Sequence, residues 1–119
     1  MADTISWNLH LNVKEGRLDD LKVLIGEMVA STREELGSIG YEWFLSADGS
    51  VCHINERYAD SNAVMEHLGN FGAKFAERFL ACLEPTGFSV YGDPSDEARA
   101  ALDGFGAAYL GPVGGFSRG

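Results

Sequence analysis

Residues 5–13 read Ile5-Ser6-Trp7-Asn8-Leu9-His10-Leu11-Asn12-Val13, and this stretch decides how the rest of the chain is interpreted. Apolar side chains occupy its odd positions and polar side chains its even positions. A period of two predicts a β-strand with one apolar and one polar face. The segment is therefore expected to be a strand in a half-buried sheet.

The period changes to that of a helix after the turn at residues 14–16. Apolar side chains then recur at helical spacing through residues 17–36, and Gly37 is a suitable residue to end this helix. Residues 41–46 and 51–58 are β-prone and flank a turn rich in Asp, Gly and Ser, which predicts a hairpin.

A second helix is predicted after the hairpin. Asp60 or Ser61 can cap its start, Gly69-Asn70 is expected to break it, and Pro85 to stop it. Residues 88–91 predict a fourth strand. The order is then βαββαβ, the arrangement of a ferredoxin-like α+β fold.

Length and composition indicate one small acidic globular domain. The chain has 119 residues, 45% of them hydrophobic, and a formal net charge of −9. This charge argues against binding to nucleic acid and disfavours an anionic membrane surface. No signal peptide or membrane span is expected, and Cys52 and Cys82 form no CxxC pair. A reduced, cytoplasmic protein is the expectation.

Two helices can cover only one face of a four-stranded sheet. The other face is expected to expose large apolar side chains, which a second copy would cover, so the sequence predicts a homodimer. Within a single domain over 1–119, the fold core is expected at residues 4–92. The extension at 93–119, with a helical stretch at 96–102, is expected to dock on the domain or on the partner subunit.

The stretch Asn55-Glu56-Arg57-Tyr58-Ala59-Asp60-Ser61-Asn62-Ala63-Val64-Met65-Glu66-His67-Leu68, together with the element order, resembles a known family. It is similar to the antibiotic biosynthesis monooxygenase-like (ABM) domain of the dimeric α+β barrel superfamily. Glu56, Tyr58 and His67 match a strand end with Glu and an aromatic residue, followed by a helix with a His. The resemblance covers residues 4–92.

The resemblance implies a homodimeric barrel with a small-molecule pocket between the sheet and the helices of each subunit. Some relatives oxygenate phenols or quinols without metal or flavin, so we expect no cofactor and a cofactor-independent monooxygenase of an aromatic or quinol substrate. The alternative is a non-catalytic dimeric binding or accessory domain. Haem breakdown is not expected, although Asn8 matches that branch, because Glu77 stands where its iron-ligating His would be.

His67 is the candidate for chemistry. A neutral imidazole can take the proton of a phenol or hydrogen-bond to its oxygen, and Tyr58 and Asn8 are expected to orient the substrate. The alternative is a structural His67 that caps the helix. The candidates for the substrate-binding wall are Tyr41, Trp43, Phe71 and Phe75. The pattern itself favours plain core and dimer interface, because Phe71 and Phe75 have the four-residue spacing of any buried helix face.

Other polar and charged residues are given ordinary roles. His10 and His53 resemble a metal-binding pair but lack an obvious third ligand, so no metal site is predicted. The pairs Glu34-Glu35 and Glu56-Arg57 are interpreted as surface charges. Cys52 and Cys82 are interpreted as inert core thiols.

Overall fold

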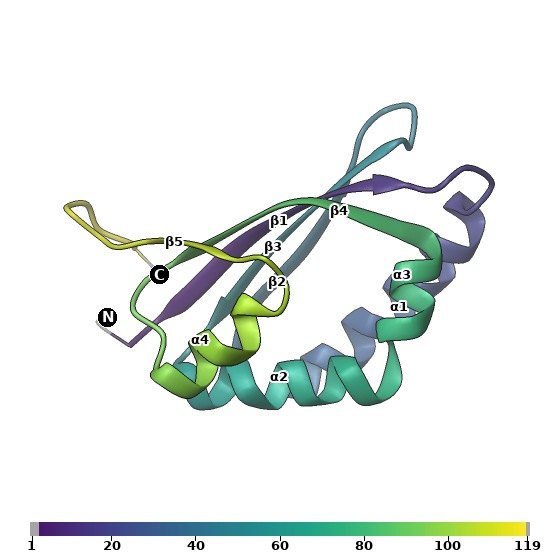
Figure 1. Cartoon of the computed structure of the whole chain (residues 1–119). Helices are drawn as coiled ribbons and strands as arrows, with labels where there is room; N and C mark the ends of the chain where they lie inside the picture. Colours follow the sequence, from purple (N-terminus) through teal and green to yellow (C-terminus); the bar gives the residue numbers. More distant parts are fainter. Residues whose placement is uncertain (1–2, 119) are drawn as a thin grey trace.

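A computed structural model describes residues 3–118 as a twisted sheet with helices on one of its faces (Figure 1). The elements, in chain order, are β1 (Ile5–Val13), α1 (Leu18–Arg33), β2 (Ser38–Leu45), β3 (Val51–Tyr58), α2 (Ser61–Lys74), α3 (Ala76–Cys82), β4 (Leu83–Tyr91), α4 (Asp96–Asp103) and β5 (Ala108–Leu110). The ferredoxin-like α+β fold is confirmed.

The sheet has the strand order β2-β3-β1-β4-β5. The pairings of β1 with β3, β1 with β4, and β2 with β3 are antiparallel. The alternation of β1 is confirmed, because Ile5, Trp7 and Leu11 are buried beneath the helices. As the central strand, β1 sets the register of both its neighbours.

The second helix is divided at a different place from the one predicted. Asp60 caps α2 as expected, since its carboxylate accepts a hydrogen bond from the Ala63 amide. The break is at Phe75 and not at Gly69-Asn70, which α2 contains within its length. Gly and Asn cost helix stability without forbidding the conformation, so packing of the helix can override them.

The first helix is shorter than predicted, and Gly37 has another role than a helix cap. The helix α1 ends at Arg33, four residues before Gly37. A Cβ atom on Gly37 would lie 2.5 Å from the Cβ of Ala63 in α2. The glycine is required because the backbone before β2 approaches α2 too closely for a side chain.

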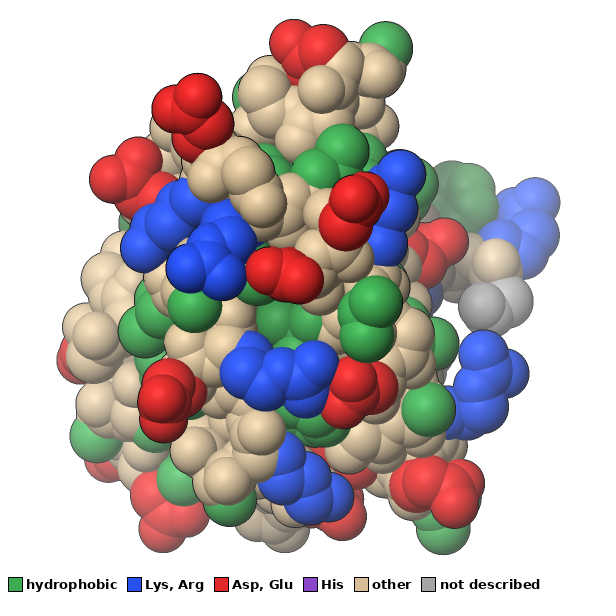
Figure 2. Space-filling model, turned by 90° about the vertical axis from the view of Figure 1, so that its right-hand side faces the viewer, with side chains coloured by type: hydrophobic (Ala, Val, Ile, Leu, Met, Phe, Trp, Pro, Cys, Tyr) green, Lys and Arg blue, Asp and Glu red, His purple; other side chains and the backbone are tan. Residues whose placement is uncertain are grey.

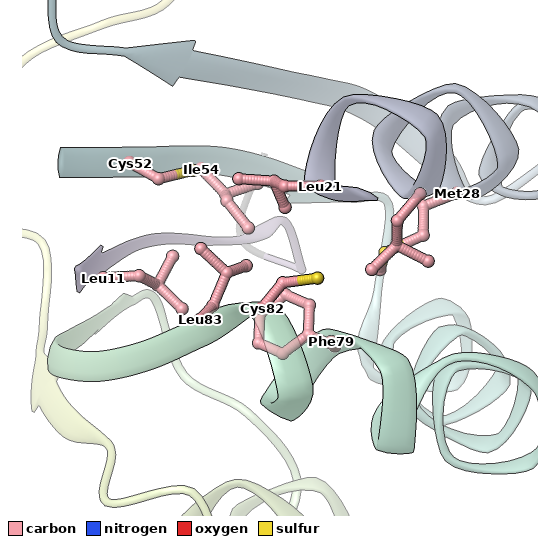
Figure 3. Close-up of a cluster of buried hydrophobic side chains, with 9 residues drawn as sticks. Leu11, Leu21, Met28, Cys52, Ile54, Phe79, Cys82 and Leu83 are labelled. Atoms are coloured by element: carbon pink, nitrogen blue, oxygen red, sulfur yellow. The ribbon is translucent and has the colours of Figure 1, made fainter. Parts of the chain in front are cut away.

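The core consists of two clusters under the sheet. The first packs α1 and α3 against one half of β1 and β3 (Figure 3), and its buried members are Leu11, Leu21, Leu24, Met28, Cys52, Ile54, Phe79, Cys82 and Leu83. The second lies under the other half and contains Ile5, Trp7, Tyr58, Ala63, Val64, Val90, Ala98 and Leu102. Cys52 and Cys82 are free and buried, as predicted.

The C-terminal extension docks on its own domain. The predicted helix is present as α4, which lies beside α2 and buries Ala98 and Leu102 (Figure 1). The strand β5 was not predicted and pairs in parallel with the end of β4. Beyond β5, the Arg57 guanidinium donates a 3.1 Å hydrogen bond to the Ser117 hydroxyl.

The uncovered face of the sheet is more polar than predicted. Asn8 lies opposite Asn55 and His10 opposite His53, and all four side chains are on this face. The expected broad apolar patch is absent from the centre of this face, because the even positions of β1 and residues His53, Asn55 and Arg57 of β3 are polar. Around these polar residues the same face exposes the apolar side chains Phe44, Val51 and Tyr91.

The surface over α1 and α3 mixes charges of both signs. Figure 2 shows acidic and basic side chains interspersed on this side, with apolar side chains between them. Arg78 of α3 donates two hydrogen bonds, of 2.8 and 2.9 Å, to the Glu27 carboxylate of α1. Among residues 3–118, no helix is long and apolar enough to cross a membrane.

Candidate functional site

A cavity of about 410 Å³ lies between the sheet and the helices, bounded by members of both core clusters. Its lining is Trp7, Leu9, Met28, Tyr41, Ile54, Glu56, His67, Leu68, Phe71, Ala76, Phe79, Leu80, Pro85, Phe88, Gly104 and Phe105. A volume of this size, with apolar walls and a few polar groups, is typical of small-molecule sites.

Apart from the Tyr41 phenol, Glu56 and His67 are the ionisable side chains of this wall. Glu56 reaches the cavity because the alternation of β3 turns it inward with Ile54 and Tyr58. His67 reaches it from the inner face of α2. Their exposed fractions are only 6% each, so both ionisable groups lie in an apolar environment.

A chain of polar contacts joins His67 to two carboxylates. Its Nδ1 lies 2.9 Å from an oxygen of Glu35, and its Nε2 lies 3.3 Å from Oε1 of Glu56. The Tyr58 hydroxyl donates a 2.5 Å hydrogen bond to the same Glu56 oxygen. An imidazole flanked by carboxylates at both nitrogens satisfies them best as an imidazolium, which donates from each.

Glu35 is held in place from its other side. The Ser38 hydroxyl donates a 2.9 Å hydrogen bond to Oε1, and the Asn70 amide donates a 3.0 Å hydrogen bond to Oε2. Glu35 is 4% exposed. Since buried charges are tolerated only when they are paired and hydrogen-bonded, these contacts explain how the carboxylate remains in the core.

The neighbours of each group shift its pKa in a direction that the geometry explains. Burial lowers the pKa of His67, but the Glu56 and Glu35 carboxylates outweigh burial and raise it above the ordinary 6.5. Burial, followed by the Glu56 charge, raises the pKa of Tyr58 and of Tyr41. Both tyrosines therefore stay protonated and remain hydrogen-bond donors.

The raised pKa of His67 predicts a pH-dependent stability. The folded state favours the imidazolium, so its contribution to the free energy of unfolding is fully present below about pH 6.5 and is lost as pH rises through the higher folded pKa. We expect the melting temperature of the wild type to fall more than that of His67→Gln between about pH 6 and about pH 9. A difference between the two proteins that stays constant with pH would contradict the shift.

The structure brings together some of the predicted site residues. Tyr41 and Phe71 line the cavity with His67. The Tyr58 ring packs behind His67 with ring centroids 5.1 Å apart. Tyr58 therefore supports the site through its hydrogen bond to Glu56, and is not itself part of the cavity wall.

Three predicted residues lie away from the cavity wall. Asn8 is on the opposite face of the sheet, where its side-chain amide donates a hydrogen bond to Oδ1 of Asn55. The sheet therefore separates Asn8 from His67. Trp43 packs edge-on against Tyr41 and Phe79. Phe75 occupies the break between α2 and α3 and packs against the first core cluster.

Sequence reasoning missed the two carboxylates of the network. The interpretation of Glu35 and Glu56 as surface charges is wrong, because both are buried against His67. The signal was present in the periodicity. Glu56 is in phase with Cys52, Ile54 and Tyr58. Glu35, two residues beyond the end of α1, follows the buried Met28 by seven residues and so continues its helical spacing.

His10 and His53 form a stacked pair on the open face of the sheet. Their ring centroids are 4.0 Å apart and their planes differ by 4°. Within residues 3–118, no group of three or more His, Cys, Asp or Glu side chains is arranged to hold a metal ion. The pair is a stacking contact between the neighbouring strands β1 and β3.

Fold and cavity together define a ferredoxin-like α+β domain with an internal apolar site. A family model described as "Antibiotic biosynthesis monooxygenase" matches residues 4–85, more than half of the chain. The chain belongs to this family. No curated protein sequence matches the chain.

Solved structures share this fold at low sequence identity. MupZ from Pseudomonas fluorescens superposes with a TM-score of 0.87 at 22% identity, covering 99% of this chain and 91% of its own. SnoaB from Streptomyces nogalater, described as a cofactor-independent oxygenase, superposes with a TM-score of 0.66 at 14% identity. The match covers 79% of this chain and 96% of SnoaB. Rv0793 from Mycobacterium tuberculosis superposes with a TM-score of 0.60 at 25% identity, and the match covers 78% of this chain and 97% of Rv0793.

Proposed function

We propose that this protein is a cofactor-independent monooxygenase that acts on an aromatic or quinol substrate. The observation that carries the proposal is an apolar, aromatic cavity that reaches a buried carboxylate and imidazole, Glu56 and His67. Family membership and the similarity in fold to SnoaB support the same reaction class. The aromatic walls suit a planar ring, and the polar pair suits its hydroxyl group.

Glu56 is the proposed proton acceptor. His67 has a carboxylate at each nitrogen, so neither nitrogen offers a lone pair to the substrate when the ring is an imidazolium. Oε1 of Glu56 accepts the hydrogen bond of the Tyr58 hydroxyl and forms the ion pair with Nε2 of His67. Oε2 has no hydrogen-bond donor among residues 3–118. His67 then acts by orienting Glu56 and by balancing its charge.

The reaction begins when Glu56 takes the proton of the substrate hydroxyl. The resulting phenolate is electron-rich enough to react with dioxygen at a ring carbon. A quinol plus dioxygen then gives a hydroxyquinone plus water, so the substrate supplies the electrons and one oxygen atom enters the ring. Tyr41, which lines the cavity and keeps its proton, can donate a hydrogen bond to a developing oxyanion.

The test is oxidation of a panel of dihydroxynaphthalenes and dihydroxyanthracenes by the purified protein. We expect oxygen uptake above the rate in buffer, and one oxygen-18 atom in the product when the gas is labelled. Rates equal to spontaneous oxidation for every compound would contradict the proposal. If such compounds bind without turnover, the protein is the non-catalytic binding domain that the family resemblance also allows.

We also propose that the protein forms a homodimer through the open face of the sheet. Within residues 3–118 no helix covers this face (Figure 1), and Phe44 and Tyr91 are exposed on its strands. Sedimentation should give twice the chain mass at micromolar concentration, and a replacement of Phe44 by Lys should shift the equilibrium toward monomer. A stable wild-type monomer at that concentration would contradict the dimer.

Free, buried Cys52 and Cys82 accord with a cytoplasmic location, which we propose as well.

A further inference from the structure

We infer that Phe105, in the C-terminal extension, determines the size of the substrate that the cavity admits. The inference rests on the proposed function in one respect only, namely that the cavity is the binding site. The family match ends at residue 85, yet Phe88, Gly104 and Phe105 supply part of the cavity wall. Gly104 and Phe105 belong to the extension that follows β4, so their part of the wall lies outside the matched residues.

The extension is firmly anchored on both sides of Phe105. Before it, α4 buries Ala98 and Leu102 completely against the second core cluster. After it, β5 pairs with β4, and the Tyr109 hydroxyl donates a 2.6 Å hydrogen bond to Asp103 at the end of α4. The guanidinium of Arg99 also lies 4.5 Å from the centre of the Tyr109 ring.

The turn that carries Phe105 is closed by two backbone hydrogen bonds, from the Phe105 amide to the Leu102 carbonyl (2.9 Å) and from the Gly106 amide to the Asp103 carbonyl (3.0 Å). It joins α4 to β5 in Figure 1, and it is flanked by Gly104 and by Gly106, whose φ is +79°. Phe105 is 52% exposed although it lines the cavity, so one side of its ring faces the solvent. Its ring meets Phe71 edge-on at 6.3 Å, and Phe71 also lines the cavity.

These facts place one large side chain at the boundary between the cavity and the solvent. A ring in this position limits the length of a planar ligand that fits under α2. It also covers the near edge of a shorter ligand and excludes water from it. Phe105 touches the bound molecule and not the proton network, so it should select substrates without setting the rate of proton transfer.

The test compares binding of 1-naphthol and of the larger 1-hydroxypyrene, two stable phenols that require no turnover. Quenching of Trp7 fluorescence can report binding, because Trp7 lines the cavity. In Phe105→Ala we expect the ratio of the two dissociation constants to shift toward the larger phenol by about tenfold or more, in the range that apolar pockets achieve. In Phe105→Trp the ratio should shift toward the smaller one.

Phe116→Ala is the matched control, because Phe116 is 84% exposed in the same extension and does not line the cavity. A ratio within twofold of the wild type in Phe105→Ala, an equal shift in Phe116→Ala, or no binding of either phenol to the wild type would overturn the inference. A shifted ratio in a protein that oxidises no quinol would support the role of Phe105 while contradicting the monooxygenase.

Discussion

Replacing Glu56 by Gln should lower kcat for quinol oxidation by about a hundredfold to ten-thousandfold, the usual contribution of a general base. The amide keeps the shape of the carboxylate but cannot accept the proton of the substrate. Because the walls of the cavity are apolar, substrate affinity should change by much less than kcat. The measurement is steady-state oxygen uptake, with binding followed separately in the absence of oxygen.

Two further variants make the Glu56 result specific. Glu42→Gln neutralises an exposed carboxylate of β2, opposite Asn55 and away from the cavity, and should leave kcat unchanged. His67→Gln should lower kcat less than Glu56→Gln does, since its proposed role is to orient Glu56. The reverse order would make His67 the base, and a Glu56→Gln protein with more than half the wild-type kcat would exclude Glu56 from that role.

Replacing Glu35 by Ala should reduce the free energy of unfolding by about 3–5 kcal/mol, the usual effect of removing one member of a buried ion pair. His67 would lose one of its two carboxylates, and Ser38 and Asn70 would lose their acceptor. Small domains have only about 5–15 kcal/mol in total, so this is a large fraction. Urea denaturation followed by circular dichroism measures it.

The neighbouring residue provides the control. Glu34 is exposed at the end of α1, and Glu34→Ala should change the free energy of unfolding by about 0.5 kcal/mol or less. The loss of unfolding free energy in Glu35→Gln should lie between those of Glu34→Ala and Glu35→Ala, because an amide oxygen can still accept hydrogen bonds from Ser38 and His67. Equal losses in Glu34→Ala and Glu35→Ala would show that the buried network adds nothing to stability.

Local patterns were enough to predict most of the sheet. The nine-residue alternation of β1 and the hairpin of β2 and β3 depend on neighbouring residues, and both are present. Pro85 misled the sequence interpretation, because proline lacks an amide hydrogen and is rare within strands. The structure accommodates it in β4 where the pairing with β1 shifts register between His10 and Leu11.

Contacts between distant segments explain what local patterns missed. The parallel pairing of β5 joins residues about twenty positions apart, and nothing within Ala108–Leu110 indicates it. The cavity depends on how α1, α2, α3, the turn after α4 and the sheet meet. The sequence predicted His67, Tyr41 and Phe71 at one site but placed Asn8 on the wrong side of the sheet relative to it. Glu35 was missed because its charge was given more weight than its seven-residue spacing from the buried Met28 of α1.

The end of the chain also affects how the molecule meets copies of itself. A sheet edge with free amide and carbonyl groups can be extended by a strand from another molecule. Here β5 pairs with the last residues of β4, and Pro85 removes one donor near its beginning, so β4 offers no long continuous edge. This arrangement disfavours strand addition along β4, so β2, at the opposite edge, is the longer strand that another molecule could extend.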